Sequence, residues 1–213
     1  AGLNIPDKVW QVIDTHWRAD QHPEDDSGAA GWSIGIVHGD HKMDPKTALD
    51  FYISEQGPMT AAGAAILSLT ERKLYSEQLI TAKAGEKTPQ LHRAIRWLDQ
   101  HFALDESVAG TDWFYYMWTI QRVAQANGIR SLNDVDTFRD ITAEIINRQS
   151  EDGLWRDPTG VQGKLMSTGY ALLYLTNAVG NPVGISKIEF EGDWNNRPAD
   201  LWNFVEYASD QYE

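Results

Sequence analysis

The residues with the clearest chemical potential stand together in one short segment, DWFYYMW, at positions 112–118. Asp112 begins it, and the aromatic residues of interest follow as Trp113, Tyr115, Tyr116 and Trp118. A carboxyl group among aromatic rings loses hydration, so its pKa rises and it can act as a general acid. The rings can stack on a sugar or shield a carbocation. Two interpretations stay open: a site with Asp112 as its acid, or a helix that Asp112 caps and whose rings are core.

Other catalytic and metal-binding patterns are weak or missing. The chain has no cysteine, which excludes disulfides, cysteine–zinc sites and thiol nucleophiles. Of six histidines, only His38 and His41, near Asp40 and Asp44, have metal-like spacing. No second cluster adds ligands, so we predict no metal and no cofactor. No stretch matches a phosphate-binding glycine loop or a nucleophile elbow.

The overall charge restricts the partners. A formal net charge of −13 argues against nucleic acid and against an anionic membrane surface. Neutral and cationic ligands stay open, including hydrophobic molecules and carbohydrates. No stretch approaches the roughly 20 apolar residues of a membrane span. The first residues, AGLNIPDKVWQ, lack the order of a signal peptide, and a helix follows almost at once. This start suggests a segment cut from a longer protein.

The rest of the chain must position these residues, and its periodicity predicts an all-α protein. Amphipathic helices are expected from Pro6, with Val9, Trp10, Ile13 and Trp17 on one face, and over 88–102 and 135–149. More uniformly apolar helices are expected over 57–73, 111–128 and 165–182. Each amphipathic helix precedes an apolar one, so the pattern indicates three helical hairpins.

The apolar helices recur at nearly constant intervals. They begin near Met59, Asp112 and Ser167, which are 53 (59 to 112) and 55 (112 to 167) residues apart. Such a period is typical of an array of hairpins, with the amphipathic helices outside and the apolar ones inside. The first turns of the inner helices would then face the mouth of a central cavity. They add Thr60 and Thr168 to the candidate ligand-binding residues.

The joint before the last apolar helix carries a recognisable spacing, Q-x-x-x-G-x-W, in the segment QSEDGLW. Gln149, Gly153 and Trp155 hold the three positions. This segment, with MTAAGAAIL, DWFYYMWTIQRV, STGYALLYL and WNNRPADL, resembles the terpenoid cyclase and protein prenyltransferase superfamily of α/α-toroids. The likeness is to squalene-cyclase-like domains of uncharacterised multidomain bacterial proteins, and it spans most of the chain.

The resemblance implies a fold and a structural joint. In the family the Gln caps the outer helix and stacks on the Trp, roles that Gln149 and Trp155 would take. A degraded version stands at Gln21 with Gly31-Trp32, and the stretch near Gln100 lacks the Trp. We therefore expect a partial or half toroid of about three hairpins over 1–180. Residues 181–213 would form a mixed tail, a cap or the start of another domain.

The chemistry that the resemblance implies lacks required residues. The acidic cyclase motif has only DVDT, Asp134 to Thr137, as its counterpart, and Asp134 or Asp136 is an expected helix cap there. The zinc site of prenyltransferases and the thioester of complement-type toroids need a cysteine. We therefore expect a non-catalytic binding or assembly module, completed by further domains or a second copy. The alternative is an enzyme for an isoprenoid or polysaccharide, with Asp112 as general acid.

Overall fold

The computed structural model describes residues 5–33, 55–75, 89–105, 113–156 and 163–178, and these ranges are mostly helical. They contain α1 (Asp7–Ala19), α3 (Gly57–Leu74), α5 (Pro89–His101), α6 (Trp113–Asn127), α7 (Arg139–Asn147) and α8 (Lys164–Ala178). The strands of the described ranges are β1 (Ser131–Leu132) and β2 (Val135–Asp136), which pair antiparallel. The expectation of a mainly α-helical chain is confirmed.

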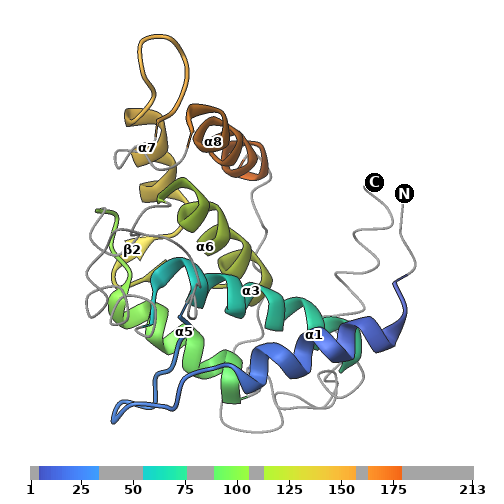
Figure 1. The fold of residues 1–213 in the computed structure, drawn as a ribbon. Helices are drawn as coiled ribbons and strands as arrows, with labels where there is room; N and C mark the ends of the chain where they lie inside the picture. The colour runs from blue at the N-terminus through green and yellow to red at the C-terminus, as the bar shows by residue number, and fades with distance from the viewer. Residues whose placement is uncertain (1–4, 34–54, 76–88, 106–112, 157–162, 179–213) are drawn as a thin grey trace, which may run out of the picture.

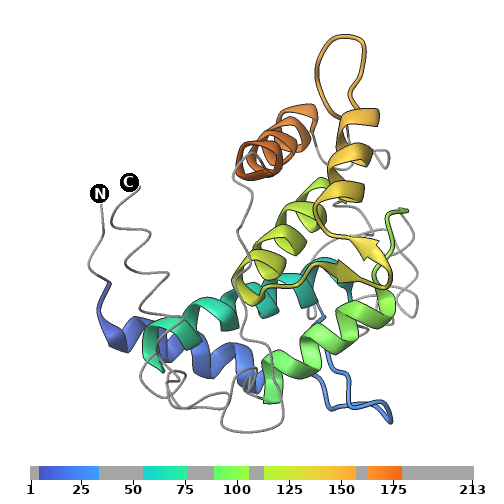
Figure 2. The same ribbon diagram turned by 180° about the vertical axis from the view of Figure 1, so that it is seen from behind.

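The apolar helices form a row, and the amphipathic helices pack against it. The three apolar helices contact one another in sequence order, α3 against α6 and α6 against α8. Helices α1 and α5 pack on α3, and α7 packs on α8 (Figure 1). The view from behind shows the same order, with α6 between α3 and α8 (Figure 2). Helix α6, which carries the aromatic segment, therefore lies in the middle of the apolar row.

The helix limits follow from proline and glycine. Pro58 and Pro89 lie in the first turns of α3 and α5, where a missing backbone N–H costs nothing. Gly128, with φ of +63°, ends α6, and the N–H of Ile129 donates to the carbonyl of Ala124. The predicted stop at Asn127-Gly128 is confirmed.

The predicted helix over 135–149 is too long at its start. Val135 and Asp136 belong to β2, and the turn before it holds Asn133 and Asp134 at φ of 46° and 64°. Asn and Asp tolerate this left-handed conformation, which two-residue hairpin turns require. The Asp136 carboxylate accepts hydrogen bonds from the N–H groups of Phe138 and Arg139 at 3.0 and 2.8 Å. Of the two residues expected to cap the helix, Asp136 therefore binds N–H groups at the start of α7, and Asp134 lies in the hairpin turn.

One hydrophobic core connects these helices. Its largest fully buried side chains include Trp32, Phe102, Trp113, Tyr116 and Tyr174. On α5, Leu91 and Leu98 are buried, and so are Ile141 and Ile145 on α7.

Helix α1 departs from its predicted pattern. Val9 is 44% exposed, Trp10, Ile13 and Trp17 are only partly buried, and the buried residue of α1 is Asp14. The apolar period therefore located the helix but not its buried face. Polar contacts described below explain why α1 turns Asp14 inwards.

The predicted tail, 181–213, lies outside the described residues, and so does the limit near residue 180. Within the part of the chain that is described, no helix has the length and apolarity needed to cross a bilayer.

Candidate functional site

Hydrogen bonds hold the third joint, which contains Gln149, Gly153 and Trp155. The Trp155 indole is 5% exposed, and its Nε1 donates to the carbonyl of Ile145, 2.7 Å away. The Trp155 backbone N–H donates to the Thr168 hydroxyl on α8, at 3.0 Å. Gln149 donates to the carbonyl of Gly153 across the turn, at 2.9 Å, and Gly153 has φ of +80°. The joint therefore fastens α7 to α8 through hydrogen bonds to backbone atoms.

The first joint repeats these contacts although its sequence spacing is longer. The Trp32 indole donates to the carbonyl of Trp17, at 2.9 Å, and its backbone N–H donates to the Thr60 hydroxyl, at 3.1 Å. Trp17 stands four residues before Gln21, as Ile145 stands four before Gln149. The version at Gln21 and Trp32 is thus complete in its hydrogen bonds.

These contacts give Thr60 and Thr168 a structural role. Both hydroxyls accept a hydrogen bond from a joint tryptophan, and Thr60 is fully buried. Neither residue is among those that line the groove described below. Thr60 lies in the first turn of α3 and Thr168 in the second turn of α8, and both hydroxyls bind the joints.

The aromatic segment of α6 divides between core and surface. Trp113 and Tyr116 are 1% and 0% exposed, and burial raises the pKa of the Tyr116 hydroxyl. The Trp113 indole donates to the carbonyl of Leu104, and the Arg148 guanidinium lies 4.2 Å from its ring centre. These two candidates therefore belong to the core.

Tyr115 and Trp118, in contrast, are only partly buried and lie together. They contact Tyr170 of α8, with ring centres 5.4 and 5.6 Å apart respectively. This aromatic group borders a groove between α3 and α6, with a volume of about 490 Å³. The volume falls within the range of small-molecule sites.

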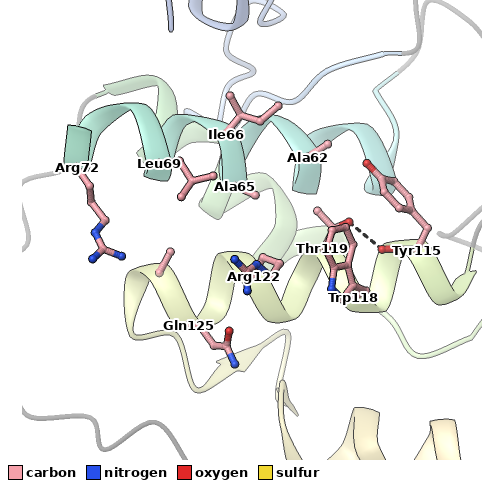
Figure 3. Close-up of a pocket in the computed structure, with 11 residues that line it drawn as sticks. Ala62, Ala65, Ile66, Leu69, Arg72, Tyr115, Trp118, Thr119, Arg122 and Gln125 are labelled. Atoms are coloured by element: carbon pink, nitrogen blue, oxygen red, sulfur yellow. Dashed lines mark hydrogen bonds between the residues drawn. The ribbon is translucent and has the colours of Figure 1, made fainter. Parts of the chain in front are cut away.

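The groove is built from one face of each helix. Figure 3 shows α3 on one side and α6 on the other, with the aromatic pair near one end. The residues from α3 are Ala62, Ala65, Ile66, Leu69 and Arg72, and those from α6 are Tyr115, Trp118, Thr119, Arg122, Gln125 and Ala126. Both sets recur every three or four residues, as one face of a helix does. Leu69 is 46% exposed, which shows that the groove opens to solvent.

Two arginines give the groove its positive charge. Arg72 comes from α3 and Arg122 from α6, and both side chains border the space between the helices (Figure 3). The described lining residues include no Asp, Glu or His. The groove therefore combines an aromatic end with cationic groups, an arrangement suited to binding and without an acid–base pair.

The sequence did contain a signal for one of these arginines. Arg122 is the only charged residue of α6, in a helix that is otherwise apolar or neutral. A charge in such a helix needs either a partner or a solvent-filled space. Arg72 gave no such signal, because it stands between Glu71 and Lys73 at the end of α3.

A separate group of buried charges joins α1 to α3. Arg18 donates to both oxygens of Asp14, at 2.8 and 3.0 Å, and to Glu71, at 3.2 Å. Asp14 and Glu71 are 4% and 3% exposed. Burial pushes the pKa of Asp14 upwards, but the hydrogen bonds from Arg18 and Thr70 outweigh it, so the pKa lies below its ordinary value. This cluster explains why α1 turns Asp14 inwards.

Three predicted positions fall outside the described residues: Asp112, His38 and His41. In the ranges that are described, no group of three or more His, Asp or Glu side chains is arranged to hold a metal ion. Comparisons with protein-family models, curated proteins and solved structures gave no match to this chain.

Proposed function

We propose that this chain is a non-catalytic, ligand-binding module of the α/α-toroid type within a larger protein. The observation that carries the proposal is the groove between α3 and α6, with its aromatic end and its volume of about 490 Å³. The row of apolar helices, the amphipathic helices packed against it and the repeated tryptophan joints support the choice of fold type.

The composition of the groove favours binding over catalysis. Proton transfer needs a group that titrates near neutral pH within reach of the substrate. The described lining residues include no Asp, Glu or His, the side chains that most often serve as general acids and bases. We therefore propose that Asp112, the general acid of the enzyme alternative, is dispensable for the function.

A neutral, environment-sensitive apolar dye tests the proposal. Ala65→Trp would fill the floor of the groove, so we expect the full-length chain to lose dye fluorescence. Ala143→Trp adds the same indole at an exposed position of α7 and should leave binding unchanged. Asp112→Ala should also bind normally.

Two results would contradict the proposal. Undiminished dye binding by the Ala65→Trp protein, shown to be folded by circular dichroism, would remove the groove as the site. Loss of binding in Asp112→Ala would instead favour the enzyme alternative.

A further inference from the structure

The arginines of the groove differ from the other arginines in the described ranges. Ion pairs with Asp or Glu hold Arg18, Arg93, Arg130, Arg139, Arg148 and Arg156. Arg96 donates to the carbonyl of Ser27. The side chains of Arg72 and Arg122 are exposed and make no such contact with any described residue.

This difference is notable because acidic residues are abundant. The chain has 31 Asp and Glu against 18 Lys and Arg, so an arginine on its surface will usually have an acidic neighbour. Yet the described lining of the groove holds two arginines and no acid. The groove is therefore a local cationic site in a protein with a net charge of −13.

The chemistry of arginine limits the group that fits there. A guanidinium presents a planar set of donors that matches a carboxylate or a phosphate oxygen pair. Each further negative charge on the ligand would be repelled by the acidic remainder of the protein. The acidic remainder of the protein therefore favours a singly charged carboxylate at the two arginines over a diphosphate or a nucleic acid.

The remainder of the groove requires an apolar body on the same ligand. Tyr115 and Trp118 supply ring surface, Ala62 and Ala65 leave space because they are small, and Leu69 exposes an aliphatic side chain. From Tyr115 to Gln125 the groove follows ten residues of α6, or about 15 Å at the rise of an α-helix.

We propose that the groove binds an amphiphilic monocarboxylate, with its carboxylate at Arg72 and Arg122 and its apolar body along α3 towards Tyr115 and Trp118. This inference rests on the proposed binding function and specifies the class of ligand. The carboxylate gains charge-assisted hydrogen bonds, and the apolar body is removed from water against the side chains of both helices.

The test compares ligands of one chain length, decanoate, decanol and decyl phosphate, by titration calorimetry on the full-length chain. We expect decanoate to bind about tenfold more tightly than decanol, since tenfold corresponds to one modest charge-assisted contact. Decyl phosphate, which carries more charge, should bind more weakly than decanoate.

Substitutions then locate the carboxylate. Arg72→Gln and Arg122→Gln should each weaken the binding of decanoate by about three- to tenfold and leave the binding of decanol unchanged. Arg130→Gln removes the same charge from a side chain that is 90% exposed and is absent from the groove lining, so decanoate binding should stay within about twofold.

Each result has one meaning. Equal binding of decanoate and decanol would overturn the carboxylate inference and leave the binding function standing. Tighter binding of decyl phosphate would overturn the preference for a single charge, and an equal loss in Arg130→Gln would overturn the assignment to the groove. Failure of all three ligands, together with the neutral dye, would overturn the proposed function itself.

Discussion

The first and third hairpins share the same tryptophan joint but hold their helices together by different means. Between α1 and α3, the charged groups of Asp14, Arg18 and Glu71 are in mutual contact. At the third hairpin the contact is neutral: the Tyr174 hydroxyl of α8 donates to the carbonyl of Thr137, in the turn before α7, at 2.8 Å.

The environment of the joints differs too. Gln21 donates to the carbonyl of Gln90, at 2.9 Å, and so connects the first joint to α5 of the next hairpin. Gln149 donates within its own turn and is exposed. The contacts of the tryptophan joint are therefore repeated in both hairpins, whereas the contacts between the helices differ from one hairpin to the other.

The largest expected effect comes from removing the cation of the first hairpin. Arg18→Leu would leave two buried carboxylates without their shared partner, so we expect a loss of about 3–5 kcal/mol in the free energy of unfolding. Arg139→Leu breaks the exposed pair with Asp140 in the third hairpin and should cost at most about 1 kcal/mol. Urea denaturation at pH 7 measures both. Equal losses would mean that the buried charge cluster contributes no more to stability than the exposed ion pair.

The acid dependence of Asp14 should give the next largest effect. Asp14→Asn replaces an acceptor of charge-assisted hydrogen bonds and should cost about 1.5–3 kcal/mol at pH 7. The folded-state pKa of Asp14 is lowered, so its stabilisation is complete above the unfolded pKa of about 3.9 and is lost as the pH falls through the lower, folded value. Denaturation curves from pH 7 to pH 2.5 should show the two proteins converging. A constant difference would contradict the pKa shift.

Gly63 of MTAAGAAIL and Gly169 of STGYALLYL, each followed by an apolar run, should respond oppositely to alanine. A Cβ on Gly63 would lie 2.5 and 2.7 Å from ring carbons of Trp32, whereas one on Gly169 meets nothing within 4 Å. We therefore expect Gly63→Ala to destabilise by about 1–3 kcal/mol. Gly169→Ala should stabilise by up to about 1 kcal/mol, through helix propensity alone. Thermal denaturation of both variants measures these changes in stability. A gain in stability from Gly63→Ala would refute the close contact with Trp32.

The smallest expected effect is the difference in stability between alanine variants of Gln21 and Gln149. Gln21→Ala removes hydrogen bonds to the carbonyls of Ala30 and Gln90 and should cost about 1 kcal/mol. Gln149→Ala, at an exposed position, should change stability by no more than about 0.5 kcal/mol. Paired urea titrations would show this difference. A larger cost at Gln149 would mean that its joint has a partner beyond the contacts described here.

Part of the candidate site could be predicted from local pattern. The segment 113–118 was placed on an inner helix because its residues are uniformly apolar, and Tyr115 and Trp118 do border the groove. Its division into core and surface could not be predicted, because burial depends on which neighbour covers each face. The joint at Gln149 and Trp155 was proposed from its spacing, which did not predict the partners Ile145 and Thr168. The one at Gln21 and Trp32 was obscured because a longer loop separates its residues.

The sequence alone predicted the type and order of the helices in the described ranges, since proline, glycine and apolar periodicity act over a few neighbouring residues. It also predicted that residues 113–118 lie on an apolar helix. Only the tertiary structure decided that Asp14 turns inwards towards Arg18 and Glu71, and that Arg72 and Arg122 border one groove. These arrangements depend on contacts between segments far apart in the chain. The free-energy cost of burying a polar side chain depends on those contacts, which the local sequence does not predict.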